Sequence, residues 1–329
     1  MPPLRTPPTD SRRALVAALL VLAAACGTSA PEPGSPHTST SSAITVYTLA
    51  ESGAGQPGQI SHGKPMDIDW DAPSNSFLVS TYNDGTIYRG RLNDSHVPVY
   101  IEGTLGQTAE GITIARGLLY ATGGISGQIR VYNLVTKAQV GRFDTGTGGE
   151  LVDLVVTDTG DVWATDGVRP VLWHLTPQQI TAGSGTPTAL PVTPEVPYSP
   201  SNSNLTGLVA MTNQRLVVVS EGDGTLYRID LDPHAPHGRT ITPISGASVR
   251  QGESMLLDGH RLVVADFHGL SIINLSDDAQ HATAATPIRD PAFHETFAAA
   301  RVADHYLTVS SATEDGRPPY TVLSVPAPS

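Results

Sequence analysis

A dense group of acidic residues lies in the stretch "GKPMDIDWD", at residues 63–71. Asp67, Asp69 and Asp71 occupy alternate positions there, with apolar residues between them. Carboxylate oxygens are the ligands that hard cations such as Ca²⁺ prefer, so the acids suggest a cation site. Alternation of polar and apolar residues is also typical of a half-buried β-strand. The stretch therefore has two interpretations, and they predict different chemistry.

The calcium-loop interpretation fails at two positions. An EF-hand loop that began at Asp67 would need glycine at position 72 and glutamate at position 78, where the chain has Ala72 and Leu78. We therefore expect a strand, with Ile68 and Trp70 on one face and the aspartates on the other face or at the strand ends.

Similar strands recur, because the chain contains six repeats. Each repeat has a short apolar segment with a small or acidic residue near its start, a turn, a β-rich run, a glycine and a second β-rich run. The repeats span residues 64–92, 108–134, 150–175, 204–231, 252–275 and 294–325. Their spacing, about 40–55 residues, is that of propeller blades.

The repeats also define how the blades are completed. A fourth strand-like segment follows each of the first five repeats, at 97–103, 138–146, 186–193, 238–245 and 283–290. The sixth repeat has none, but residues 43–52 form an unassigned strand before repeat one. We therefore predict an all-β, six-bladed β-propeller of four-stranded blades, with the last blade closed by the N-terminal strand. The alternative is a β-sandwich or several small β domains.

Alignment of the first strands gives a ring of equivalent positions at one mouth of the expected channel. They are Met66, Glu110, Val152, Thr206, Glu253 and Glu295. The positions that follow them are Asp67, Gly111, Asp153, Gly207, Ser254 and Thr296. Acids that face one channel would raise one another's pKa or recruit a cation.

Residues 60–325 resemble the senescence-marker-protein/gluconolactonase (regucalcin-like) family of six-bladed propellers. The resemblance is carried by "GITIARGLLYATGGISGQIRVYNLVT", "DLVVTDTGDVWATDGVRPVLW" and "GLVAMTNQRLVVVSEGDGTLYRIDL". It implies hydrolysis of sugar lactones at a divalent cation held by Glu from blade one, Asn from blades three and four, and Asp from blade five, the last also acting as the base.

Most of that ligand set is not carried over. The blade-one position is Met66, the blade-three position is Val152 directly before Asp153, and the blade-four position is Thr206. Only blade five keeps an acid, Glu253, which is the candidate catalytic residue. Because a hard cation needs six or more oxygens, the inherited site looks dismantled. A rearranged site would use Glu110, Glu253 and Glu295 as ligands of a divalent cation such as Ca²⁺, with Asp153 and Thr206 as further binding residues.

The N-terminus has the pattern of an export signal. Arg5, Arg12 and Arg13 precede a short apolar run that ends directly before Cys26, the single cysteine of the chain. This resembles a bacterial lipoprotein signal, with 1–25 removed and Cys26 lipidated; "SRRALV" also resembles a twin-arginine signal, so either export route fits. Residues 26–42 then form the lipidated cysteine and a flexible linker, and 43–329 the propeller.

The charge balance excludes one class of partner. The chain has 19 basic and 31 acidic residues; three arginines and Asp10 precede Cys26, which leaves 16 against 30 and a net charge of −14. Such a surface repels nucleic acid and anionic lipid, so membrane association is expected through the anchor.

Two main functions follow from these patterns, and an accessory role in cell-envelope assembly is a third. The first is a membrane-anchored, exported binding or interaction module that holds a small molecule or an envelope protein on the outer face of the cell membrane. The second is a metal-dependent hydrolase of sugar lactones or related esters.

Overall fold

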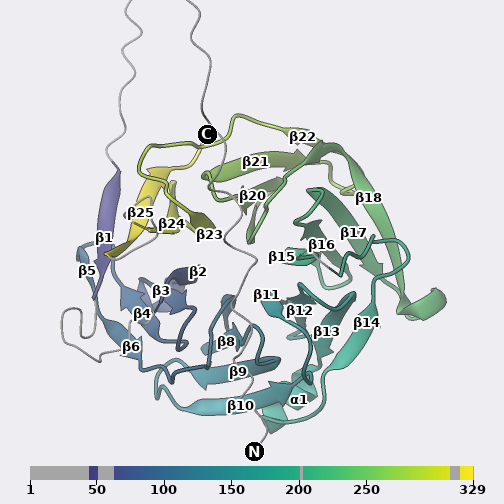
Figure 1. Cartoon of the computed structure of the whole chain (residues 1–329), viewed down its shortest axis with the longest axis horizontal. Coiled ribbons are helices and arrows are strands. Elements are labelled where there is room, and N and C mark those ends of the chain that lie inside the picture. The colour runs from purple at the N-terminus through teal and green to yellow at the C-terminus, as the bar shows by residue number, and fades with distance from the viewer. Residues whose placement is uncertain (1–43, 51–62, 201–202, 312–318, 329) are drawn as a thin grey trace, which may run out of the picture. The chain divides into compact units, whose positions relative to one another are not determined.

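The computed structural model describes residues 44–50, 63–200, 203–311 and 319–328, which are almost entirely β-strand. The strands form six sheets around a common axis, as Figure 1 shows. Ser42–Ser329 form one compact unit. The predicted six-bladed β-propeller of four-stranded blades is confirmed.

The first five blades each contain four antiparallel strands that follow one another along the chain. The strands of blades 1 and 2 are β2 (Pro65–Asp71), β3 (Ser76–Thr81), β4 (Ile87–Gly90) and β6 (Val99–Ile101), then β7 (Ile112–Ala115), β8 (Leu118–Thr122), β9 (Gln128–Asn133) and β10 (Gln139–Asp144). Those of blades 3 and 4 are β11 (Leu151–Val156), β12 (Val162–Asp166), β13 (Val171–Leu175) and β14 (Thr188–Pro191), then β15 (Leu205–Thr212), β16 (Arg215–Ser220), β17 (Thr225–Leu231) and β18 (Arg239–Ser248). Blade 5 contains β19 (Met255–Asp258), β20 (Arg261–Ala265), β21 (Leu270–Leu275) and β22 (Ala282–Ala284).

Blade 6 joins the two ends of the propeller. It contains β23 (Thr296–Val302), β24 (His305–Ser311), β25 (Tyr320–Pro326) and, as its fourth strand, β1 (Thr45–Leu49). β1 runs antiparallel to β25, as predicted for the closing strand. β1 also pairs in parallel with the two-residue strand β5 (His96–Val97), which the sequence did not predict. The N-terminal strand therefore connects blade 6 with blade 1 and leaves no open edge there.

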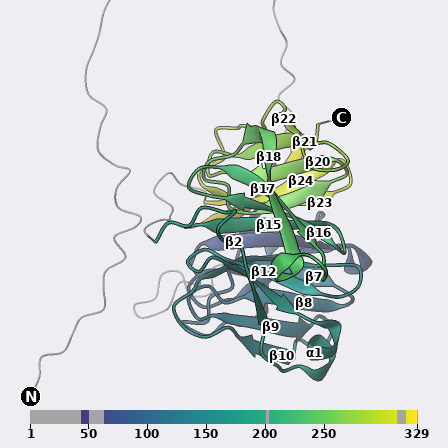
Figure 2. The ribbon, with the colours of Figure 1, turned by 90° about the vertical axis from the view of Figure 1, so that its right-hand side faces the viewer.

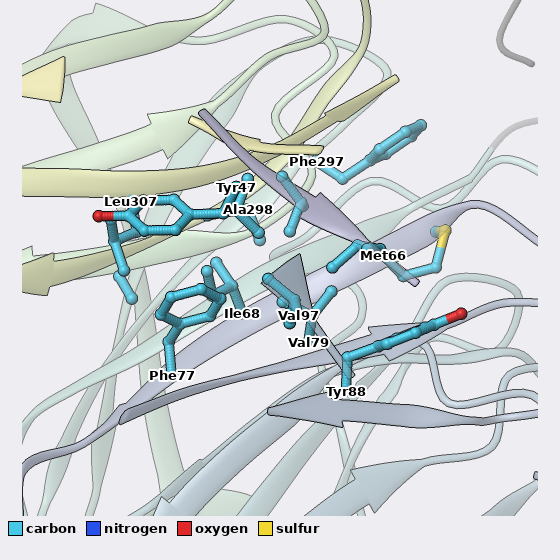
Figure 3. Packing of buried hydrophobic residues seen from close by; sticks show 14 of the residues in the cluster. Tyr47, Met66, Ile68, Phe77, Val79, Tyr88, Val97, Phe297, Ala298 and Leu307 are labelled. Carbon is cyan, nitrogen blue, oxygen red and sulfur yellow. The ribbon is translucent and has the colours of Figure 1, made fainter. Parts of the chain in front are cut away.

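Apolar side chains with a period of two fill the spaces between neighbouring blades. Figure 3 shows the cluster between blades 6 and 1, where Phe77 and Val79 of β3 meet Leu307 of β24. The rings of Tyr47 and Phe77 pack edge to face at 5.3 Å. Fully burying one such side chain stabilises the fold by about 1.5–3 kcal/mol, so these clusters hold the ring together.

Helical structure in the described residues is short. The α-helix α1 (Pro177–Ala182) is capped by Thr176, and two 3₁₀ turns, η1 (Ala72–Ser74) and η2 (Pro236–Gly238), lie in loops. No helix in this part of the chain is long or apolar enough to cross a membrane.

Figure 2 shows the disc of blades edge-on. All six inner strands start at the same face of this disc. Because strands alternate in direction within a blade, the connections between blades and the turns between second and third strands lie on that side. We call it the mouth face. The turns between first and second and between third and fourth strands lie on the opposite side, the far face.

Candidate functional site

A cavity lies at the axis, where the inner strands begin. It encloses about 240 Å³ of empty space, part of it open to solvent. The residues that line it are Met66, Asp67, Glu110, Gly111, Val152, Asp153, Glu253, Ser254 and Phe297. Neither lysine, arginine nor histidine occurs in this lining.

Consecutive residues of one strand reach the cavity because the inner strands are bulged. The pairing of β2 with β3 shifts between Pro65 and Ile68, and β11, β15 and β23 have equivalent shifts. A bulge turns two successive residues toward the same side. We call the first layer of residues the mouth ring: Met66, Glu110, Val152, Thr206, Glu253 and Phe297. The layer that follows is the waist ring: Asp67, Gly111, Asp153, Gly207, Ser254 and Ala298.

The bulge corrects the predicted register in blade 6 by two residues. Thr296 pairs with Ser310 before the shift, as Pro65 pairs with Thr81 in blade 1. Phe297 therefore occupies the mouth-ring position that the sequence alignment gave to Glu295. The Glu295 carboxylate instead forms an ion pair with Lys64, and its side chain is 37% exposed. The alignment was wrong here because the repeat motif does not show where β23 begins relative to the acid that precedes it.

The structure does bring two of the three predicted glutamates to one cavity. Glu110 and Glu253 belong to blades 2 and 5, which are opposite one another in a ring of six. Glu110 is buried and Glu253 half-buried. The predicted binding residue Thr206 is buried beside the cavity but does not line it, because its hydroxyl donates to the Gly252 carbonyl at 2.5 Å.

The aspartates of the "GKPMDIDWD" stretch connect blade 1 to blade 2. Asp67 accepts hydrogen bonds from the Ile68 amide at 2.8 Å and from the Ile112 amide of β7 at 2.6 Å. Asp69 repeats the arrangement two residues later, with the Ile114 amide at 2.6 Å. Alternate carboxylates therefore bind alternate N–H groups on the free edge of β7, which would otherwise be buried without partners.

Asp153 makes the same connection between blades 3 and 4. Its carboxylate accepts from the Leu154 amide at 2.7 Å and from the Leu208 amide of β15 at 2.9 Å. The third acid of the first stretch, Asp71, has a different role and pairs with Arg89 at 2.7 Å. These aspartates are structural, and the strand interpretation of the stretch is confirmed.

Burial raises the pKa of these carboxyl groups. The pKa of Asp153 rises to about 7 and that of Asp69 to about 6. The pKa of Asp67 is raised well above its ordinary value, first by burial and then by the negative charge of Asp153. Hydrogen bonds from backbone amides lower the same pKa values, because they stabilise the carboxylate. Asp67 and Asp153 therefore repel one another at the waist ring.

Hydroxyl groups on the second strands add a further set of connections, which sequence reasoning missed. Ser80 accepts from the Asp67 amide and donates to the Glu110 carbonyl of the next blade. Thr122 and Thr165 do the same in blades 2 and 3. The sequence signal for these connections was a Ser or Thr directly after an apolar residue near the end of the second strand. It is Ser80 in "VST", Thr122 in "YAT" and Thr165 in "WAT".

Two glycines of the waist ring allow neighbouring inner strands to approach closely. A Cβ atom on Gly111 would lie 2.5 Å from the Val152 carbonyl oxygen of blade 3. A Cβ atom on Gly207 would lie 2.6 Å from the Met255 side chain of blade 5. Both distances are shorter than van der Waals contact, so the waist ring requires glycine at these positions.

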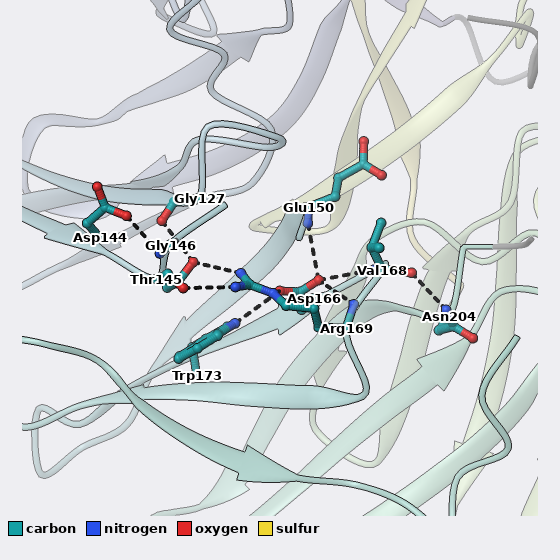
Figure 4. Close-up of polar contacts among 11 residues, drawn as sticks. Gly127, Asp144, Thr145, Gly146, Glu150, Asp166, Val168, Arg169, Trp173 and Asn204 are labelled. Carbon is teal, nitrogen blue, oxygen red and sulfur yellow. Dashed lines mark hydrogen bonds and ion pairs between the residues drawn. The ribbon is translucent and has the colours of Figure 1, made fainter. Parts of the chain in front are cut away.

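Another buried acid at the mouth face, Asp166, belongs to a network that joins blade 3 to the end of β10 in blade 2, which Figure 4 shows. It accepts from the Glu150 amide, from Arg169 at 2.7 Å and from the Trp173 indole at 3.0 Å. Arg169 in turn donates to the Thr145 carbonyl at 2.8 Å. These contacts fix the turn after β12 and leave Asp166 fully buried.

The donor set does not fit a hard cation. At the mouth ring, Met66, Val152 and Phe297 offer no oxygen from their side chains, and the waist aspartates already accept backbone amides. Among the described residues, no group of three or more His, Cys, Asp or Glu side chains could hold a metal ion. The proposed triad of Glu110, Glu253 and Glu295 is thus not assembled. Cys26 and the segments before residue 43 lie outside the described residues.

Comparison with known proteins shows the fold and no family. No family model matches the chain, and no curated protein sequence matches it. Among solved structures, a gluconolactonase from Xanthomonas campestris aligns with a TM-score of 0.58 and 13% identity, over 81% of this chain and 86% of that one. Virginiamycin B lyase from Staphylococcus aureus gives 0.58 and 12%, over 86% and 89%. The WD40 repeats of RRP9 give 0.58 and 9%, over 86% and 97%. Proteins with such different names share the propeller equally well, so the likeness identifies the architecture alone.

Proposed function

We propose that the protein is an exported, lipid-anchored propeller that acts as a binding or interaction module and carries a degraded lactonase-type metal site. The similarity in fold to a gluconolactonase supports the origin of the site. The side chains at the mouth ring support its loss. A small molecule or a protein of the cell envelope is the proposed partner, and the acidic surface disfavours nucleic acid.

One observation carries this proposal. Asp67 and Asp153, the two aspartates that line the cavity, each accept one backbone amide of their own strand with one carboxylate oxygen and one amide of the neighbouring blade with the other. A calcium ion needs six or more oxygen ligands. Coordination of an ion by these aspartates would compete with the amide hydrogen bonds that join blades 1 to 2 and 3 to 4. The carboxylates therefore serve the ring and not a reaction.

The alternative function is a metal-dependent hydrolase of sugar lactones or related esters. One observation favours it, namely that Glu110 and Glu253 line the same cavity from opposite blades. In this scheme Glu253 would act as the base and the two glutamates would hold the ion. Ser254 is the only other oxygen-bearing side chain of the lining that is not an acid.

Elemental analysis and a lactone-hydrolysis assay together separate the two functions. The binding module should contain no stoichiometric Ca²⁺, Zn²⁺ or Mn²⁺ and should not hydrolyse lactones when these ions are added. A hydrolase should contain one ion per chain and lose activity in Glu253→Gln. Glu295→Gln is the matched control, because that residue lies outside the cavity. A bound ion whose loss follows Glu253→Gln alone would refute the binding-module proposal.

The proposed anchor can be tested separately. The Cys26→Ser variant should move from the membrane fraction to the soluble exported fraction, because no lipid can then be attached to the sulfur. Retention of the variant in the membrane fraction would argue against lipidation as the means of attachment.

A further inference from the structure

The far face of blades 1 and 2 carries basic residues without acidic partners. Arg91, Arg116 and Lys137 are exposed, and none lies within ion-pair distance of a carboxylate among the described residues. The nearby exposed acid Asp94 accepts the His96 amide at 3.0 Å. A second exposed acid, Asp158, lies beside Arg116, whose guanidinium donates to the Asp158 backbone carbonyl. Three bases thus face two acids here, which is a small positive excess in a chain that is strongly acidic overall.

Two exposed apolar side chains lie in the same turns. Val135 is 88% exposed, the highest value among the large apolar residues that the structure describes, and Leu92 is 39% exposed. The turn that carries Val135 is well defined, because Asn133 accepts the amides of Val135 and Thr136 at 3.0 and 2.9 Å. Val135 is thus presented to solvent on a fixed backbone.

These turns adjoin one another. The Tyr100 hydroxyl donates to the Leu134 carbonyl, and the Lys137 ammonium lies 4.4 Å from the centre of the Tyr100 ring. The Leu134 amide donates to the Gly117 carbonyl at 3.0 Å, which brings the Arg116 turn alongside. We call Arg91, Leu92, Arg116, Val135 and Lys137 the basic corner.

The basic corner lies beside the point where the chain enters the propeller. β1 runs parallel to β5, so both strands start at the far face. The Thr48 amide donates to the Ser95 carbonyl at 2.7 Å, and the Tyr47 hydroxyl donates to the Leu92 carbonyl at 3.3 Å. A linker that precedes residue 44 is therefore attached next to these turns.

We propose that the basic corner is a docking surface for an anionic lipid bilayer. Apolar side chains that enter the interfacial region, with basic side chains at the level of the headgroups, are the combination that binds such surfaces. The proposal rests on the lipid anchor of the proposed function, which would hold this face near the membrane. Docking there would point the mouth face away from the bilayer, toward its partner.

Vesicle co-sedimentation of the compact unit 42–329, which lacks Cys26 and contains every strand that the structure describes, tests the proposal. The unit should bind vesicles of phosphatidylglycerol and phosphatidylcholine, should not bind phosphatidylcholine alone, and should be released by salt. Each neutralised charge should lower the partition coefficient about fivefold, so Arg91→Gln with Lys137→Gln should lower it at least tenfold. Val135→Ser should also lower it severalfold.

Matched controls lie on the mouth face. Ile125 is 70% exposed in a turn of the same blade 2, and Arg250 is an exposed base. Ile125→Ser and Arg250→Gln should leave vesicle binding unchanged, and circular dichroism should show all variants folded. Absence of preference for anionic vesicles, or equal loss of binding in the controls, would overturn the proposal. This outcome is independent of the metal and lactone assays, which test the proposed function.

Discussion

The mouth ring and the waist ring are one residue apart in every blade, yet their acids have different environments. At the waist ring, Asp67 and Asp153 each accept one backbone amide of their own strand and one of the next blade. At the mouth ring, Glu110 and Glu253 line the cavity among Met66, Val152 and Phe297. The difference shows that acid content alone does not identify a cation site. The partners that the fold gives to the carboxylate oxygens matter as well.

The largest expected effect is on the close approach at the waist ring. Gly111→Ala should destabilise the protein by about 1–3 kcal/mol or more, because its Cβ would lie 2.5 Å from the Val152 carbonyl oxygen. Denaturant unfolding measures this. Gly106→Ala is the control, since its Cβ meets nothing within 4 Å and only its positive φ of 82° causes strain, about 1 kcal/mol. Equal effects in the two variants would show that the inner strands are not packed as described.

Removal of one connection between blades should have the next largest effect. Asp67→Ala leaves the buried Ile112 amide without its acceptor, and should cost about 1–3 kcal/mol of unfolding free energy. Glu253→Gln in the mouth ring keeps its size and should cost less than about 1 kcal/mol. If the mouth-ring variant proved the more destabilising of the two, the structural role would belong to the mouth ring and not to the waist ring.

The raised pKa values predict an unusual dependence of stability on pH. Asp153 and Asp69 titrate near 7 and 6 in the folded protein, and near 3.9 when unfolded. The folded state thus binds more protons between about pH 4 and 7, so these groups contribute less stability as the pH rises through that range. The melting temperature should fall from pH 5 to pH 8, and Asp153→Asn should reduce the slope. A melting temperature that rises over this range in the wild-type protein, unchanged in the variant, would contradict the description of the waist.

The smallest effect is expected outside both rings. Glu295→Gln breaks the ion pair with Lys64, whose side chains are 37% and 28% exposed, and should change stability by no more than about 1 kcal/mol. Phe297→Ala, at the true mouth-ring position of blade 6, should cost several times as much because Phe297 is buried. Thermal unfolding of both variants would verify the corrected register.

Sequence periodicity was sufficient to predict the architecture. Six repeats gave the six blades, and the strand missing from the last repeat was matched by the unassigned N-terminal strand, which completes blade 6. It was sufficient for most of the cavity too, where Met66, Glu110, Val152 and Glu253 lie as aligned. It was not sufficient in blade 6, since the repeat motif does not fix where β23 begins, and Glu295 was placed at the position of Phe297. It also could not show which amides the aspartates meet, because Ile112 and Ile114 are 45 residues away from their acceptors. The basic corner was likewise hidden, as Arg91, Arg116 and Lys137 form no run in the sequence.

Amide hydrogen exchange at Ile112 and Leu208 tests the central claim most directly. Both amides donate to waist aspartates, so the account predicts slow exchange in the wild-type protein, unaffected by a chelator of divalent cations. In Asp67→Ala, exchange at Ile112 should accelerate by tenfold or more while Leu208 stays protected. Faster exchange at both amides on addition of the chelator to the wild-type protein would show that a cation organises the waist, and would contradict the account.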